Sequence, residues 1–395
     1  MPAPDPNALL QRLTACRAET AATAAVDALP VLLRLSQADD RATFAALLVH
    51  HPGCQVHDTI ETQLRDLVKL EHPARCLTKL DYQQLIEEKL AGRNSDEYGV
   101  WVYYPWRNCF VHFLNEADFV RVRTIRNAYK ITPAEQQQLA GKKVGVVGLS
   151  VGQSVTLALA LERIAGEIRI ADFDTLELSN LNRIRAGVAS LGLPKTTVVR
   201  REIAEIDPFL RVVTFEEGIT PGNVDAFLHE GGPLDLLVEE CDNLAIKVLL
   251  REQARRGGIP VLMETSDRGM LDVERYDLDP AYPVLHGRLP AEASYEHLAA
   301  LRTPAERLPH VLALLGPDTL SDELKASMAH IGHTITTWPQ LGTDVMLGGA
   351  IAASTARRIL LGHPIASGRR YFDIGPALLA ERTELKIKNL VVPNL

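Results

Sequence analysis

The sequence of 395 residues has few cysteines and no long apolar run. Its five cysteines are odd in number, widely spaced and never arranged as Cys-x-x-Cys. This pattern excludes the disulfide framework of small secreted domains and offers no cysteine pairs for a structural zinc. No apolar run reaches the ~18–20 residues that span a bilayer, and the N-terminus lacks the basic start and apolar core of a secretory signal. We therefore expect a reduced, cytoplasmic protein that does not bind a membrane.

An excess of basic residues is also missing. The 50 aspartates and glutamates outnumber the 42 lysines and arginines, and no long basic block occurs. The charge therefore gives no indication of nucleic-acid binding. Hydrophobic residues make up 46% of the chain and charged residues 23%, which is ordinary for a globular protein of one or two domains.

Residues 143–162 have the pattern of a strand, a glycine turn and a helix. A short β-branched run is followed by the turn with Gly148, Ser150 and Gly152, and then by an apolar helical segment. Backbone N–H groups at such a helix start attract anions, so the pattern predicts a phosphate site. The next predicted strand ends in Asp172, roughly 20 residues later, where nucleotide-binding folds place the carboxylate that holds a ribose hydroxyl.

On its own, the glycine turn fits more than one function. It also matches Gly-x-Ser-x-Gly, the nucleophile elbow of serine hydrolases, in which Ser150 would attack the substrate. His286 or His310 could then serve as the base, but no feature of the sequence selects either. A nicotinamide-dependent oxidoreductase would share the strand, turn, helix and acidic residue.

Beyond Asp172, predicted helices and strands alternate. They occupy residues 195–205, 210–215, 222–230, 234–239, 244–256 and 260–264. This alternation is typical of a mainly parallel sheet with helices on both faces. We predict an α/β, Rossmann-like domain over residues 121–277, with an N-terminal α+β accessory region over 1–120 and a C-terminal substrate-side or dimerisation extension over 278–395.

The N-terminal region contains a cluster of aromatic residues. They gather at 98–114, although aromatic residues are only 5% of the chain, and two β-rich runs there flank Pro105-Trp-Arg-Asn108. This pattern predicts a hairpin. Its aromatic side chains would form either a packed sheet face or a docking surface for a peptide strand.

Three helices carry local signals. Asp81 is a candidate cap for a helix over 81–90, and the segment from Thr132 to Glu135 reads as a capping box. Residues 343–361 are rich in glycine and alanine, which predicts a tightly packed helix.

A larger set of residues occurs in a fixed order after the glycine turn. The set comprises Asp172-Phe-Asp174, Ser179-Asn180-Leu-Asn-Arg183, Lys195 and Glu239-Glu-Cys-Asp242-Asn243. Over roughly residues 123–275, this order resembles the adenylation domain of the ubiquitin-activating-enzyme-like superfamily, of the ThiF and MoeB type. The resemblance implies an adenylyltransferase that uses ATP and Mg²⁺ to activate a carboxylate as an acyl-adenylate, and it implies a homodimer.

The resemblance also assigns roles to residues. It implies that the turn at Gly148, Ser150 and Gly152 approaches the phosphates and that Asp172, with Asp174 beside it, holds the ribose. Asn180 and Arg183 would contact the triphosphate, Lys195 would be the catalytic lysine, and Asp242 would bind the magnesium ion. Glu239 replaces the first aspartate of the family's Asp-x-x-Asp-Asn motif. Arg123 or Arg126 occupies the place of an arginine that reaches the partner subunit's ATP.

The sequence departs from the family pattern at two places. Ser150 and Val151 stand where a Gly-Gly pair is usual, and no cysteine follows Cys241. We therefore expect no thioester intermediate, as in the peptide-modifying MccB-type members. The carboxylate would belong to a peptide, to a protein C-terminus such as that of a ubiquitin-like protein, or to a small molecule. A non-catalytic nucleotide- or peptide-binding module is the remaining alternative.

Several residues are candidates for the substrate side. Asp267 and Arg268 follow a strand that ends at the same edge of the sheet, and Arg268 could hold a carboxylate. The segment with Trp338 and Gln340 could lie nearby. His310, His330 and His333 could line the substrate side too. The three-residue spacing of His330 and His333 offers no third metal ligand, so we expect structural or solvent-facing roles for these histidines.

Overall fold

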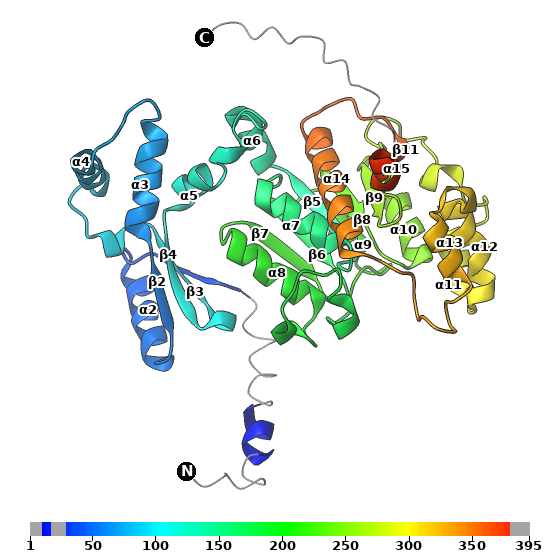
Figure 1. Ribbon diagram of the computed structural model, residues 1–395, viewed down its shortest axis with the longest axis horizontal. Helices are drawn as coiled ribbons and strands as arrows, with labels where there is room; N and C mark the ends of the chain where they lie inside the picture. The colour runs from blue at the N-terminus through cyan, green and yellow to red at the C-terminus, as the bar shows by residue number, and fades with distance from the viewer. Residues whose placement is uncertain (1–9, 17–28, 380–395) are drawn as a thin grey trace, which may run out of the picture.

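The computed structural model describes residues 10–16 and 29–379 and contains two β-sheets (Figure 1). The larger has seven strands in the order β11-β10-β9-β8-β5-β6-β7, and the smaller has four in the order β1-β3-β4-β2. In Figure 1 the smaller sheet lies at one end of the molecule, and the helices α11–α13 lie at the other.

The seven-stranded sheet is parallel over five neighbouring strands. These are β7 (Arg211–Phe215), β6 (Glu167–Ala171), β5 (Lys143–Val147), β8 (Leu236–Glu239) and β9 (Val261–Thr265). β10 (Met270–Glu274) and β11 (Gly368–Tyr371) extend the sheet in antiparallel fashion. The prediction of a mainly parallel sheet is therefore confirmed. The chain builds outward from β5 first to one side and then to the other, so the sheet has a switch point between β5 and β8.

Helices cover both faces of this sheet because alternate side chains of each strand point to opposite faces. Val146 packs in the cluster that includes α7 (Gly152–Glu162), α8 (Lys195–Ile206) and α14 (Gly342–Leu360). Val147, the next residue, packs in the cluster that includes α9 (Val224–His229) and α10 (Leu244–Arg256).

Segments from beyond residue 277 complete this unit. β11 pairs with β10, and α14 lies against α7. A Cβ atom at Gly349 would overlap the side chain of Ser154 in α7, so only glycine allows this approach. The tight packing predicted from the small residues is confirmed. The sheet consequently extends across the division that the sequence suggested at residue 277.

The smaller sheet includes the predicted aromatic hairpin. β3 (Val100–Tyr104) and β4 (Cys109–Phe113) are antiparallel neighbours, flanked by β1 (Val31–Leu33) and β2 (Gln55–Asp58). All five residues of β3 are buried. The aromatic cluster is therefore a packed sheet face, and the interpretation as a peptide-docking surface is wrong.

The remaining helices surround these two sheets. Near the smaller sheet lie α2 (Ala38–His50), α3 (Ile60–Glu71), α4 (Lys79–Leu90) and α5 (Glu116–Arg123). α6 (Pro133–Ala140) lies by the larger sheet, where its Leu139 packs in the same cluster as Val144 of β5. Further along the chain come α11 (Tyr295–Ala300), α12 (Pro304–Leu315), α13 (Asp322–Met328) and α15 (Ile374–Leu379).

Two of the predicted caps can be compared with the structure. The capping box of Thr132 and Glu135 at the start of α6 is confirmed. Asp81, however, is not the cap of α4: Thr78 is, and Asp81 is the third residue of the helix, whose carboxylate accepts from the Thr78 backbone N–H.

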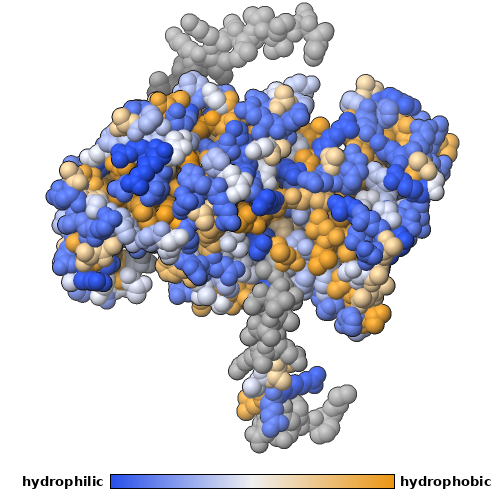
Figure 2. Space-filling view, turned by 180° about the vertical axis from the view of Figure 1, so that it is seen from behind, coloured by the Kyte–Doolittle hydropathy of each residue, from blue (hydrophilic) through white to orange (hydrophobic). Residues whose placement is uncertain are grey.

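Within the described part of the chain, no helix is both long and apolar enough to cross a membrane. Over the face seen in Figure 2, hydrophobic and hydrophilic residues are interspersed.

Candidate functional site

A cavity of about 810 Å³ opens at the switch point, where the carboxyl ends of β5, β6 and β8 meet. Most residues that the sequence singled out line it: Gly148, Ser150, Asp172, Asp174, Asn180, Arg183, Lys195 and Asp242. Gly152 begins α7 directly behind the turn. The cavity lies at the position where open α/β sheets bind their ligands, and its volume suits a nucleotide.

The glycine turn passes very close to the end of β8. Gly148 has φ +86°, and a Cβ atom there would lie 2.7 Å from the backbone of Glu240. Both the backbone conformation and the close approach therefore require glycine. The hydroxyl of Ser150 accepts a hydrogen bond of 3.0 Å from Arg183, so the departure from the Gly-Gly pair ties the turn to a neighbouring cation.

Asp172 is fixed by the backbone around it. Its two carboxylate oxygens accept from the N–H groups of Leu149 at 2.6 Å and Asp174 at 2.8 Å. Burial raises the pKa of Asp172 above its ordinary value, although these hydrogen bonds and the nearby Lys195 oppose the rise. The carboxylate is thus held in one orientation at the cavity wall.

Lys195 is the buried cation of the site. Only 6% of the residue is exposed, and its ammonium group lies 2.8 Å from the Asp174 carboxylate. The lysine starts α8, where a cation is unfavourable to the helix dipole. An anion in the cavity would offset this cost.

Asn180 and Arg183 are positioned by a turn after β6. The Asn180 side chain accepts from the Glu177 N–H at 3.0 Å and is buried, which stabilises the turn. Arg183 lines the cavity, and burial lowers the pKa of its guanidinium while the carboxylate of Asp242 opposes that change. Arg183 therefore links the glycine turn electrostatically to the end of β8.

Asp242 is an exposed carboxylate on the wall of the cavity. The cap of α10 is its neighbour Asn243, whose side chain accepts from the N–H groups of Ala245 and Ile246. Asp242 is therefore not needed as a helix cap. Among the described residues, no cluster of three or more acidic, histidine or cysteine side chains forms a metal site. Magnesium needs only one or two carboxylates beside phosphate oxygens and water, so Asp242 fits this requirement.

Glu239 does not line the cavity. It is fully buried, and it pairs with Lys247 at 3.1 Å and with Arg251 at 2.5 Å. Burial alone would raise the pKa of Glu239, but these cations lower it to about 2. The residue that replaces the family's first aspartate is therefore part of a buried ion network.

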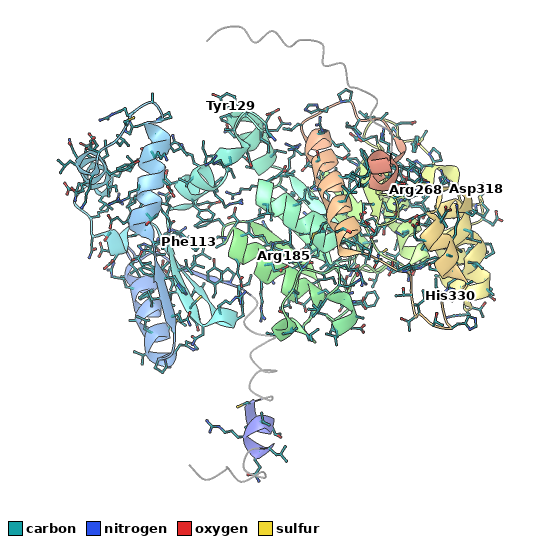
Figure 3. All side chains as sticks on the ribbon, viewed as in Figure 1. Phe113, Tyr129, Arg185, Arg268, Asp318 and His330 are labelled. Carbon is teal, nitrogen blue, oxygen red and sulfur yellow. The ribbon has the colours of Figure 1, made fainter. Side chains whose placement is uncertain are left out.

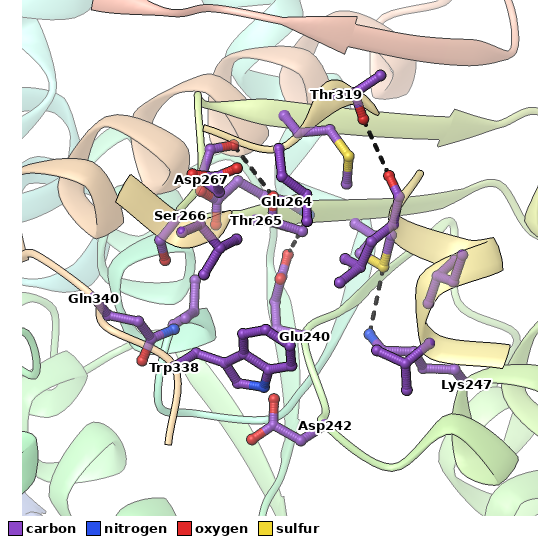
Figure 4. Close-up of a pocket in the computed structure, with 18 of the residues that line it drawn as sticks. Glu240, Asp242, Lys247, Glu264, Thr265, Ser266, Asp267, Thr319, Trp338 and Gln340 are labelled. Carbon is purple, nitrogen blue, oxygen red and sulfur yellow. Dashed lines mark hydrogen bonds between the residues drawn. The ribbon is translucent and has the colours of Figure 1, made fainter. Parts of the chain in front are cut away.

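A second cavity of about 200 Å³ adjoins the first, and Asp242 lies on the wall of both (Figure 4). Glu240 and Glu264 face this second cavity. Burial and the carboxylate of Asp344 raise the pKa of Glu264 to about 8. Burial and Glu264 likewise raise the pKa of Glu240 well above its ordinary value.

Sequence reasoning missed Glu240 and Glu264, and it also missed Arg307 of α12, which lines the first cavity. The two glutamates lie at the carboxyl ends of the predicted strands 234–239 and 260–264, where they signalled an acidic edge of the sheet. For Arg307 no signal existed, because nothing in the sequence places α12 over the cavity.

The predicted substrate-side residues divide into two groups. Asp267, Trp338 and Gln340 line the second cavity. Arg268 lies outside the residues that line either cavity, because its guanidinium pairs with Asp373 at 2.8 Å and donates to the carbonyl of Thr319. His310, His330 and His333 line neither cavity, and Figure 3 shows His330 at the edge of the C-terminal helices.

The two arginines before β5 lie in different surroundings. Arg123 donates to the carbonyls of Ala160 and Leu161 at the end of α7 and pairs with Asp207 at 3.0 Å. It is therefore a structural residue that holds α7. Arg126 is exposed and lines neither cavity of its own chain, and its contact with a partner's nucleotide stays a prediction.

The geometry argues against a serine hydrolase. Ser150 is hydrogen bonded to Arg183, and no histidine lines either cavity in the parts of the chain that the structure covers. His286 pairs with Asp272 at 3.2 Å, away from Ser150. The general base that an elbow serine requires is therefore not beside it.

The fold and the site define a class of protein: a doubly wound α/β protein with a nucleotide-sized cavity at its switch point, lined by both acidic and basic side chains. The ThiF family model matches residues 123–375, and the chain belongs to the ThiF family. The resemblance predicted from the ordered residues is thereby confirmed. A nicotinamide-dependent oxidoreductase is the wrong interpretation.

Among curated proteins, the chain is similar to Uncharacterized protein MT1398 of Mycobacterium tuberculosis, with 47% identity over 278 residues, which is 70% of this chain and 38% of that protein. It is 26% identical to the tRNA threonylcarbamoyladenosine dehydratase of Bacillus subtilis over 39% of this chain and 60% of that one. It is 35% identical to the probable adenylyltransferase/sulfurtransferase MoeZ of M. tuberculosis over 32% and 31%, respectively. The chain thus spans less than two thirds of each of these relatives.

Two solved structures are similar in fold. The Escherichia coli tRNA N6-threonylcarbamoyladenosine dehydratase TcdA, in complex with AMP, has 21% identity and a TM-score of 0.45 over 63% of this chain and 98% of that chain. E. coli MccB with MccA-N7isoASN has 14% identity and a TM-score of 0.44 over 79% and 88%.

Proposed function

We propose that this protein is an ATP- and Mg²⁺-dependent adenylyltransferase that activates a carboxylate. In the reaction, a carboxylate oxygen attacks the α-phosphorus of ATP, an acyl-adenylate forms and pyrophosphate leaves. The observation that carries the proposal is the meeting of Lys195, Arg183 and Asp242 around one nucleotide-sized cavity in a chain of the ThiF family.

The residues of the cavity supply what this reaction needs. Two anions must meet, so their charge has to be neutralised and their positions fixed. We infer that the turn at Gly148 brings backbone N–H groups to the phosphates, with Lys195 and Arg183 as the cations beside them. Asp172 and Asp174 would hold the ribose hydroxyls. Mg²⁺, when bound at Asp242, would neutralise further charge on the phosphates.

We infer that the acyl-adenylate is handed on without a thioester. The cysteine nearest the site, Cys241, lines both cavities, but burial and the carboxylate of Glu239 raise the pKa of its thiol. The reactive thiolate is therefore disfavoured.

Substrate and assembly are part of the proposal. The carboxylate would belong to a peptide, to a protein C-terminus such as that of a ubiquitin-like protein, or to a small molecule. We also propose that the protein is a homodimer located in the cytoplasm. Arg126 of one subunit would reach the nucleotide bound by the other. Arg126 supports this because it is exposed at the surface of its own subunit.

The test is ATP–pyrophosphate exchange with Mg²⁺ and a panel of carboxylates and peptides with free C-termini. We expect exchange that depends on one class of carboxylate and falls at least about 100-fold in Lys195→Ala and Asp242→Ala, because each removes a charge from the transition state. The matched controls are Lys79→Ala and Asp66→Ala, which alter exposed residues on α4 and α3.

The opposite result has a defined meaning. Absence of exchange with the whole panel, combined with ATP binding that survives Asp242→Ala, would replace the enzyme with a non-catalytic nucleotide-binding module. Nicotinamide cofactors added in parallel should leave the protein's fluorescence unchanged.

A further inference from the structure

Two residues that line the second cavity have side-chain oxygens without a hydrogen-bond partner among the described residues. They are Glu264, with both carboxylate oxygens, and Ser266, with its hydroxyl, and all three oxygens are buried. A buried polar group without a hydrogen bond costs free energy, so a gathering of such groups in one hollow indicates a polar ligand.

Glu264 lines this hollow and is held between Glu240 and α14. Its residue is only 3% exposed, and its backbone N–H donates to Glu240 at 2.9 Å. α14 passes so closely that a Cβ atom at Gly348 would overlap the Glu264 carboxylate. Glycine at this position of α14 therefore makes room for an acidic group that receives no hydrogen bond from the described part of the chain.

The charges around the hollow are acidic. Glu240, Glu264 and Asp267 line it, and the carboxylate of Asp344 at the start of α14 raises the pKa of Glu264. The one cation among its lining residues, Lys247, lies 3.1 Å from Glu239 and is already paired. A cation bound here would favour the ionised forms of these carboxyl groups, and a group with several N–H donors and a positive charge would match the site.

We propose that the second cavity binds the ammonium group of a small primary amine, with Glu264 and Glu240 as its acceptors. An ammonium group supplies three donors and one positive charge for the unpartnered oxygens. Met263, Met270 and Leu314 form an apolar wall that suits the carbon stem. The volume of about 200 Å³ limits the occupant to a molecule of roughly amino-acid size.

The position of the cavity links the amine to chemistry at the first site. Asp242 and Glu240 line both cavities, so the far end of an amine held by Glu264 lies near the proposed site of adenylation. This link rests on the proposed function, whereas amine binding does not. The amine belongs either to the carboxylate substrate itself or to an acceptor. As an acceptor, the ammonium group would lie at Glu240, which lines both cavities, and would first lose a proton to solvent. The neutral nitrogen would then attack the acyl carbon, an amide would form, AMP would leave and a second proton would be released.

The test uses the full chain and the fluorescence of Trp338, which lines the same cavity (Figure 4). We expect n-butylamine and 5-aminopentanoate to change the emission in a saturable way, and butanol and pentanoate not to. Trp338→Phe shows which part of the signal comes from this residue. In Glu264→Gln, the affinity for both amines should fall at least about tenfold, because a charge-assisted hydrogen bond is lost.

A matched control is Glu323→Gln, which alters an exposed acid on α13 and should leave the affinity unchanged. Thermal melting verifies that both variants are folded. Saturable binding that is equally tight in folded Glu264→Gln, or no binding of either amine to the wild-type protein by calorimetry, would overturn the proposal.

Exchange measurements separate this proposal from the proposed function. Exchange driven by 5-aminopentanoate but not pentanoate places the amine on the carboxylate substrate. Faster AMP release on addition of butylamine to a different activating carboxylate identifies the amine as the acceptor. Amine binding without any ATP–pyrophosphate exchange would support the proposed amine site and overturn the proposed adenylyltransferase activity instead.

Discussion

At the scale of single residues, Glu239 and Asp242 show how differently two acids at the end of one strand can behave. Glu239 is fully buried and pairs with Lys247 and Arg251, whereas Asp242 is exposed on the wall of two cavities. The motif in the sequence predicted a site acid at Asp242. It could not predict that Glu239 would turn inward, because its partners come from the helix that follows.

Glu264 gives a prediction on pH dependence. Its pKa is raised from 4.5 to about 8, so the folded protein binds this proton more tightly than the unfolded chain does. The pH dependence is therefore opposite to that of a salt-bridged carboxylate. The contribution of Glu264 to the free energy of unfolding is greatest below pH 4.5 and is lost as the pH rises through 8. Glu264→Gln removes the cost of ionising this buried carboxyl group. The melting temperature of the variant should therefore rise relative to that of the wild type as the pH increases from 5 to 9.

Thermal melting across that range, with Glu323→Gln as the control, measures this difference. A gap between Glu264→Gln and the wild type that does not change with pH would contradict the raised pKa.

At the scale of elements, the sequence predicted those whose signals are local. The helix over 244–256 and the strands around the glycine turn were recognised because their apolar periodicity and turn residues lie within the segments themselves. The sequence could not predict that α14 packs against α7 at Gly349, since α7 lies almost 200 residues earlier in the chain. The meeting of Glu240 and Glu264 at one cavity could not be predicted for the same reason, because the walls of that cavity come from β9, α12 and residues 338–340.

The contact between α7 and α14 can be tested with Gly349→Val. The added side chain would overlap Ser154, so the helices must separate, and overpacking of this kind costs about 1–3 kcal/mol. Ala350→Val alters the next residue, which is exposed, and should cost only about 0.5 kcal/mol through helix propensity.

Urea unfolding of both variants measures the two costs. Equal midpoints would show that the close approach of α7 and α14 does not contribute to stability.

At the scale of the whole molecule, the N-terminal sheet is joined to the nucleotide-binding unit through α8. The hydroxyl of Tyr104 donates to the carbonyl of Ala204 at 3.0 Å, and Trp106 and Arg107 both donate to the carboxylate of Glu205. All the described residues that line the two cavities, in contrast, lie within the ThiF-family region, and none comes from the accessory sheet.

Glu205→Ala should loosen this junction without changing the site. Three hydrogen bonds are lost at a partly exposed position, for which we expect a cost of about 1 kcal/mol. Hydrogen exchange at β3 and β4 should become faster, while ATP binding stays the same. Glu87→Ala, an exposed acid on α4, is the control, and unchanged exchange in Glu205→Ala would refute the role of this contact.

Because α14 and β11 are synthesised long after the strands they pack against, their position in the chain affects folding during translation. The five parallel strands have all been synthesised by Thr265, but the helix that covers part of their apolar face ends only at Leu360. At ordinary elongation rates, this gap lasts on the order of 5–20 seconds. During that time the nascent sheet presents an uncovered apolar surface, which makes it a client for chaperones and a point at which stalled translation would lead to aggregation.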